Sequence, residues 1–151
     1  MPFARKSEIR CLDVAISDQL SCSKDFSMLE PGLTYTSILE VTADKLALSM
    51  GSGDLSVLAT PAMMALMENA AMLAVAAELP MGSSTVGGHI STSHLRPTAL
   101  GKRVSATALL TAVDGRKLTF AISAQDEEGN CLGEGTHLRF IVDKEKFLSK
   151  L

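Results

Sequence analysis

Cysteine is scarce in this sequence, and the few cysteines follow no framework. There are three, Cys11, Cys22 and Cys131, and no CxxC spacing occurs. An odd number without such spacing predicts neither a disulfide framework nor a zinc site. A reducing compartment is the simplest context for these thiols, so we expect a cytoplasmic protein. We also expect no metal, because the histidines lack the close spacing of metal ligands, and we expect no cofactor.

Basic charge and long hydrophobic runs are also lacking. The formal net charge is -3, and without a basic stretch or helix face we expect no nucleic-acid partner. The longest apolar stretch, residues 61–77, contains Glu68 and Asn69 and is short for a membrane span. Charged residues interrupt any signal-peptide core in residues 1–27. We therefore expect no membrane partner, one domain over residues 28–151, and a poorly ordered or surface-packed extension over 1–27.

Aromatic residues and familiar catalytic motifs are scarce too. The chain has no Trp and one Tyr but eight Met, which favours a core or pocket lined by soft, adaptable side chains. It has no GxSxG elbow and no GxxxxGK[ST] phosphate loop. Gly87-Gly88 opens no predicted helix, so it is not a dinucleotide fingerprint.

The clearest feature that is present is a long helical pattern. Thr60 can cap the helix with its hydroxyl, and Pro61 suits the first helical position, where no N–H is needed. The pattern runs through Leu79 and ends before Pro80. Its residues are almost all Ala, Met, Leu and Val, and a helix that is apolar nearly all round must be covered on most sides.

Strand patterns lie before and after this helix. They cover residues 33–41, 85–94, 103–113, 117–125 and 131–142. Asp114-Gly115 is a hairpin signal, and residues 144–151 are expected to form a short helix or tail. One antiparallel sheet wrapped around one apolar helix is an α+β fold. Its unpaired edge strands favour a homodimer.

Glu68 is the carboxylate inside the apolar helical pattern. Its neighbours three and four residues away are Met64, Ala65, Ala71 and Met72. Loss of water there would disfavour its charged form and make it a candidate acid, base or nucleophile. A solvent-facing or interface stripe is the alternative. Thr60, eight residues earlier, can face the same side of the helix, about 80° away, although N-capping alone is its simpler explanation.

The three histidines are candidate general bases near neutral pH. His89 and His94 are five residues apart in one predicted strand, so they point to opposite faces. His137 shares its strand face with Arg139. A surface or hydrogen-bonded structural role is the expectation for His89 and His137. Solvated positions at strand ends or turns are expected for Arg96, Lys102, Arg103, Arg116, Lys117 and Arg139.

Four segments together resemble the fluoroacetyl-CoA thioesterase group of the hotdog superfamily. They are TPAMMALMENAA, GGHISTSHLRPTALGKRV, DGRKLTFAISAQDEEG and GEGTHLRFIVDKEKF. The resemblance implies a hotdog fold and dimers with active sites at the subunit interface. It implies that Thr60, Glu68 and His94 are catalytic, that a backbone group near Gly87 approaches the thioester, and that Arg139 lies near the site.

One departure from the family concerns substrate choice. Fluoroacetate-specific members carry a longer, Phe-containing lid before the catalytic helix, whereas residues 50–59 here are shorter and contain no Phe. The resemblance therefore favours hydrolysis of a small to medium acyl-CoA more than fluoroacetyl selectivity. The alternatives are a non-catalytic acyl-CoA-binding or sensing module, a hotdog hydratase, for which no Asp paired with His94 is evident, and a structural protein whose helix is only core.

Overall fold

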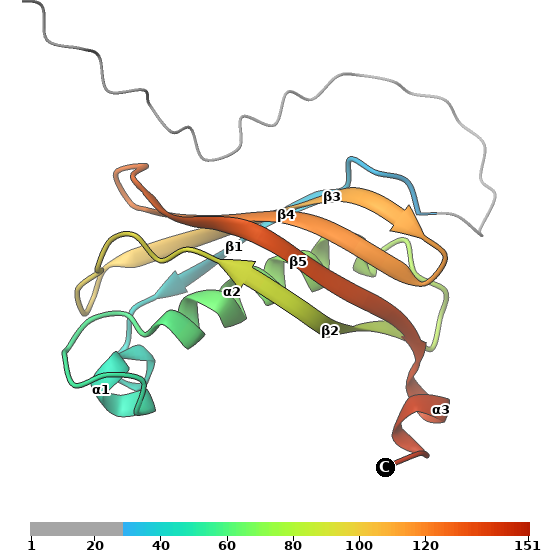
Figure 1. The fold of residues 1–151 in the computed structure, drawn as a ribbon, viewed down its shortest axis with the longest axis horizontal. Coiled ribbons are helices and arrows are strands. Elements are labelled where there is room, and N and C mark those ends of the chain that lie inside the picture. Colours follow the sequence, from blue (N-terminus) through green and yellow to red (C-terminus); the bar gives the residue numbers. More distant parts are fainter. Residues whose placement is uncertain (1–28) are drawn as a thin grey trace, which may run out of the picture.

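A computed structural model describes residues 29–151 of the chain, so the expected extension over 1–27 lies outside the described residues. Five strands and one long helix dominate the fold (Figure 1). The elements in chain order are β1 (Thr34–Glu40), a 3-10 turn (Ala43–Lys45), α1 (Ala47–Met50), α2 (Thr60–Ala76), β2 (Ser83–Thr92), β3 (Arg103–Asp114), β4 (Lys117–Asp126), β5 (Cys131–Asp143) and α3 (Lys144–Leu148).

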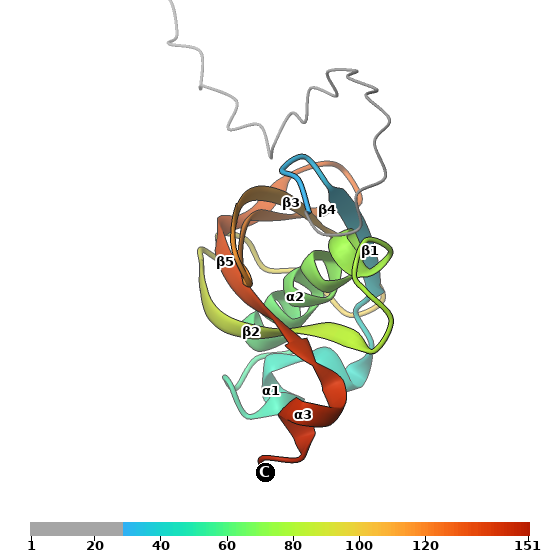
Figure 2. The same cartoon turned by 90° about the vertical axis from the view of Figure 1, so that its right-hand side faces the viewer.

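The five strands form one antiparallel sheet in the order β1-β3-β4-β5-β2. The sheet curls around α2, with β1 and β2 at its two edges (Figure 2). The predicted α+β hotdog fold is therefore confirmed. The Asp114-Gly115 hairpin is confirmed as well, since Asp114 pairs with Lys117 and Gly115 has a φ of 57°.

The core lies between the concave face of the sheet and α2. On β4, the alternating residues Leu118, Phe120, Ile122 and Ala124 are all buried, as their period of two predicts. The side of α2 that faces them buries residues at helical spacing. These are Ala62, Met63, Leu66, Met67, Ala70, Ala71 and Val75.

The predicted helix is correct in position but differs at both ends. The N-cap of α2 is Ala59 and no side chain caps it, so the predicted cap by Thr60 is wrong. The helix ends at Ala76, three residues before Leu79, because the chain turns there toward β2. Pro61 lies in the first turn, as expected.

One side of α2 is not covered by the sheet. Ala65 and Asn69 are exposed there, and Met64 and Met72 are only partly buried. The single chain therefore leaves part of this apolar helix open, although its sequence predicts cover on most sides.

β2 contains a bulge next to this open side. Gly87 pairs with Arg139 and His89 pairs with Leu138, which leaves Gly88 without a partner in the register. A Cβ on Gly88 would overlap the ring of Phe140, so any other residue here would require that ring to move. Bulges of this kind re-aim the side chains and backbone groups that follow them.

No helix of residues 29–151 is both long and apolar enough to cross a membrane.

Candidate active site

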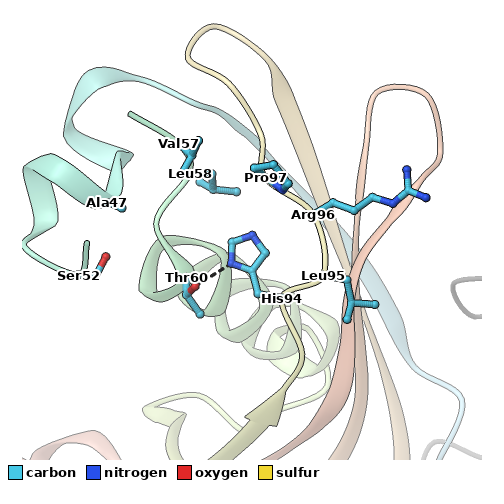
Figure 3. A pocket seen from close by; sticks show the side chains of 9 residues that line it. All are labelled: Ala47, Ser52, Val57, Leu58, Thr60, His94, Leu95, Arg96 and Pro97. Carbon is cyan, nitrogen blue, oxygen red and sulfur yellow. Dashed lines mark hydrogen bonds between the residues drawn. The ribbon is translucent and has the colours of Figure 1, made fainter. Parts of the chain in front are cut away.

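Thr60 and His94 meet at the N-terminal end of α2. Thr60 Oγ1 and His94 Nδ1 are 2.7 Å apart and share a hydrogen bond (Figure 3). His94 follows the end of β2, where Ser93 N donates to Glu134 O and Leu95 N donates to Leu132 O. These two bonds fix the backbone on both sides of His94, so its ring is held against the helix by main-chain pairing to β5.

A pocket of about 250 Å³ opens around this pair. Its walls come from the segment between β1 and α2 and from the segment after β2. The lining residues are Ala47, Ser52, Val57, Leu58, Thr60, His94, Leu95, Arg96 and Pro97. The Arg96 side chain points away from the His94 ring (Figure 3). The pocket beside the Thr–His pair is therefore walled mostly by small and apolar side chains.

The second ring nitrogen of His94 has no partner in the described part of the chain. His94 Nε2 is buried and makes no hydrogen bond within residues 29–151. Burial lowers the pKa of His94, and a backbone group of Arg96 offsets this only in part. The imidazole is therefore neutral near pH 7. In that form one ring nitrogen carries a proton and the other can accept one.

Glu68 lies in a second cluster, midway along α2. Its Oε1 is 3.8 Å from Arg139 Nη1 and 3.7 Å from His137 Nε2, both on β5. A Cβ on Gly87 would overlap Glu68 Oε1, so glycine at this position of β2 is what lets the carboxylate lie against the strand. A shallow pocket of about 400 Å³ opens here, lined by Glu68, Gly87 and Arg139 among others.

The surroundings of Glu68 differ from the sequence expectation. Its side chain is 43% exposed and faces Arg139 and His137. The predicted apolar setting is therefore wrong for the single chain. The apolar neighbours along the helix are real, but the carboxylate reaches past them to the polar groups of β5.

Arg139 is also placed differently from its expectation. It is buried in the middle of β5 rather than solvated at a strand end. Its Nε donates to Thr85 Oγ1 and its Nη2 donates to Thr85 O, both at 2.8 Å. Burial lowers the pKa of Arg139 and the Glu68 carboxylate raises it, but a guanidinium remains charged in proteins. Arg139 thus presents a fixed positive charge to Glu68.

The predicted site residues therefore form two groups in one chain. Thr60 and His94 form one, and Glu68, Gly87 and Arg139 form the other. No hydrogen bond or ion pair in the described part of the chain joins Glu68 to Thr60 or His94. Thr60 and Glu68 are eight residues apart on one helix, which corresponds to about 12 Å along its axis at 1.5 Å per residue.

Two members of the second group were missed by sequence reasoning. His137 is fully buried and contacts both Arg139 and Glu68. Thr85 supplies two of the acceptors that hold Arg139. The shared strand face of His137 and Arg139 was the one available signal, because residues two apart on a strand point the same way.

Several solved structures with this fold are thioesterases or members of the thioesterase superfamily. The structure of the fluoroacetyl-CoA thioesterase FlK superposes with a TM-score of 0.75 at 32% identity, covering 82% of this chain and 96% of that one. A FlK variant in complex with acetyl-CoA gives 0.76 at 31% identity, with 81% and 96% covered. A Thermus thermophilus member of the thioesterase superfamily shares the fold, with a TM-score of 0.74 at 24% identity over 80% of this chain and 89% of that one.

The curled sheet, the central helix and these likenesses define a hotdog-fold thioesterase, an enzyme that hydrolyses thioesters. Residues 41–145 match the family of the fluoroacetyl-CoA-specific thioesterase FlK. The fluoroacetyl-CoA thioesterase of Streptantibioticus cattleyicolor is 39% identical over 95 residues, which are 63% of this chain and 68% of that protein. The chain belongs to this thioesterase family.

Proposed function

We propose that this protein hydrolyses small to medium acyl-CoA thioesters to the free acid and CoA, with Thr60, Glu68 and His94 as catalytic residues. The observation that carries the proposal is the Thr60–His94 pair, with its 2.7 Å hydrogen bond and the buried, unpartnered Nε2 beside a pocket. Relatives of the family support the CoA thioester as substrate, since a FlK variant was solved with acetyl-CoA.

The geometry of the pair suggests how protons move. His94 Nδ1–H donates to Thr60 Oγ1, which leaves the Thr60 hydroxyl proton free to donate to the oxygen of the thioester carbonyl. His94 Nε2 takes a proton from the attacking water, and the hydroxide adds to the carbonyl carbon. The negative oxygen of the tetrahedral intermediate is stabilised by the Thr60 hydroxyl and a backbone N–H near Gly87. The C–S bond then breaks, and the thiolate takes the proton back from His94.

Glu68 is assigned to the same carbonyl, where it either attacks in place of water or orients the base. It nevertheless lies about 12 Å along α2 from Thr60 in one chain. Reacting groups must approach to about 3–3.5 Å. A single chain therefore does not bring the three residues to one substrate. We propose that a homodimer does, by closing a second copy over the open side of α2 so that Glu68 of one copy faces the partner subunit's Thr60 and His94.

The pocket wall supports the proposed substrate class. The segment between α1 and α2 contributes Ser52, Val57 and Leu58, and it carries no aromatic ring into the pocket. Such a wall suits a short or medium aliphatic acyl group. The pantetheine arm of CoA would enter between the subunits, with basic side chains near strand ends meeting its phosphates.

Subunit complementation tests this proposal. Glu68→Gln and His94→Ala homodimers should each lose activity by orders of magnitude while remaining folded. If each site draws residues from both copies, co-expression of the two variants gives hybrid dimers with one intact site, and about a quarter of the wild-type activity returns with random pairing. His89→Ala, which removes an exposed histidine, serves as the matched control and should keep full activity.

Two results would contradict the proposal. An active, folded Glu68→Gln or His94→Ala enzyme would remove that residue from the catalytic set. Inactive single variants with no recovery in hybrid dimers would place all three residues in one chain and exclude the shared site.

A further inference from the structure

His137 is a buried histidine that the proposed mechanism does not use. Its side chain is 1% exposed, and its ring packs beside Phe120 with centroids 6.4 Å apart. It lies on β5 between three groups that belong to the site or support it. These are the His89 carbonyl at the β2 bulge, the Arg139 guanidinium and the Glu68 carboxylate.

The partners of His137 fix which of its nitrogens carries the proton. Nδ1 lies 2.7 Å from the His89 carbonyl oxygen, which can only accept, so Nδ1 donates. Nε2 lies 3.2 Å from Arg139 Nη1, which can only donate, so Nε2 accepts. A ring that donates at Nδ1 and accepts at Nε2 is the neutral imidazole. A second proton, on Nε2, would point at the N–H of the positively charged guanidinium and be repelled by it.

This arrangement holds the end of Arg139 that faces Glu68. Thr85 binds Nε and Nη2, on one side of the guanidinium, and His137 binds Nη1. Nη1 is the atom that lies 3.8 Å from Glu68 Oε1. Without His137, Nη1 would still lie near the Glu68 carboxylate, but it would lose the buried acceptor that orients its N–H groups.

We propose that His137 is a positioning residue of the thioesterase, a neutral hydrogen-bond acceptor that aims Arg139 at Glu68 and so fixes the carboxylate against Gly87. The inference rests on the proposed function, because it concerns the role of Glu68 in hydrolysis. It assigns His137 no contact with the substrate.

The groups around His137 shift its pKa in opposite directions. Burial lowers its pKa most, Arg139 and His89 lower it further, and the His89 backbone carbonyl and Glu68 raise it. The result is a pKa below the ordinary value for histidine, in agreement with the neutral form that the hydrogen bonds require.

Two substitutions separate positioning from mere packing. Gln places an amide oxygen near the position of Nε2, where it can accept from Arg139. Asn places its amide near Nδ1, where it can donate to the His89 carbonyl but does not reach Arg139. We expect His137→Asn to lower kcat roughly tenfold to a hundredfold with KM changed less than about twofold. The reason is that a displaced Glu68 carboxylate slows the chemical step but does not weaken substrate binding. His137→Gln should restore kcat to within about threefold of wild type.

Thr85→Val provides a second variant if His137→Asn does not fold. It removes the hydroxyl that accepts from Arg139 Nε and leaves His137 in place, and it too should lower kcat more than it raises KM. Ile122→Val, a buried change on β4 that removes no hydrogen-bonding group, controls for general loss of packing and should keep wild-type kcat. Equal losses in His137→Asn and His137→Gln, or full activity in His137→Asn, would overturn the inference.

Nitrogen NMR of the imidazole decides the inference independently of turnover. In the wild type at pH 6.5, the ordinary pKa of histidine, His137 should give mostly a protonated signal at Nδ1 and an unprotonated signal at Nε2. The Arg139 Nε–H proton should exchange with solvent faster in His137→Asn than in His137→Gln. A His137 ring protonated on both nitrogens at pH 7, or equal Arg139 exchange in the two variants, would overturn the inference. Failure of the wild type to hydrolyse any thioester would instead remove the proposed function, and these signals would still decide how Arg139 is held.

Discussion

At the scale of single residues, Gly87 determines whether Glu68 can lie against β2. A methyl group at this position would overlap Glu68 Oε1 and come within 3.3 Å of the His137 ring. Gly87→Ala should therefore displace the carboxylate and lower kcat by about a hundredfold, while the fold is kept because the displaced group is the end of a flexible side chain. Steady-state kinetics and circular dichroism check this.

Ser84→Ala is the matched control for Gly87→Ala. It changes the same strand, and Ser84 does not line the Glu68 pocket. If Gly87→Ala hydrolyses substrate as fast as Ser84→Ala, the close approach of Glu68 to β2 has no role in catalysis.

His94 sets the expected pH dependence of the reaction. Its neutral form accepts the proton, and burial lowers its pKa below the ordinary 6.5. The rate constant kcat/KM should therefore rise with pH, and the midpoint of that rise should lie below pH 6.5. A pH–rate profile of the free enzyme tests this. A plateau reached only well above pH 7, or an acidic limb that persists unchanged in a residually active His94→Gln variant, would contradict the assignment.

The sequence predicted some of these residue contacts and missed others. Thr60, His94, Glu68, Gly87 and Arg139 could be named because their spacing resembles a family. The contacts that these residues make could not be predicted. The hydrogen bond between Thr60 and His94, for example, depends on how the segment after β2 passes the end of α2. That path is set by main-chain pairing to β5, which leaves no pattern in the side chains.

At the scale of elements, the close pairing of β5 with β2 and the residue after it depends on two strand glycines. A Cβ on Gly133 or Gly135 would overlap the backbone oxygen of Ser93 or Ser91, respectively. Backbone cannot move aside as a side-chain end can. Gly135→Ala should therefore destabilise the protein by about 1–3 kcal/mol, the usual cost of overpacking.

Denaturant unfolding of Gly135→Ala beside Thr136→Ala measures this cost. Thr136 is exposed on the same strand, so its truncation should change the free energy of unfolding by less than about 0.5 kcal/mol. Equal stabilities for the two variants would show that β2 and β5 do not approach as closely as described.

The elements themselves were largely predictable from sequence, whereas their ends were less so. The alternation on β4 and the apolar run of α2 each give a clear period, and both elements occur where predicted. The bulge at Gly88 and the end of α2 at Ala76 were not predicted. The bulge lies where the Phe140 ring occupies the place of a Gly88 Cβ, and α2 ends where the chain turns toward β2. Neither of these features follows a period in the sequence.

At the scale of the whole molecule, the proposed homodimer would account for both the two site clusters and the open side of α2. The curled sheet covers α2 on the side of Met63 and Met67 but leaves Ala65, Glu68 and Asn69 toward the open side. A second copy on that side would cover apolar surface and bring the two clusters of different chains together. The sequence pointed to a dimer through its edge strands, but the separation of Glu68 from His94 becomes visible only in the folded chain.

The central claim is that the protein hydrolyses acyl-CoA thioesters at the Thr60–His94 pair. The most direct test measures free CoA released from acetyl-, fluoroacetyl-, branched short-chain, medium-chain and aromatic acyl-CoAs by the wild type and by His94→Ala. We predict rapid release from one short or medium aliphatic class, and a rate lower by at least about a hundredfold in His94→Ala, since general base catalysis contributes 10²–10⁴-fold. Binding of these thioesters without release of CoA from any of them would contradict the account and identify a sensing module instead.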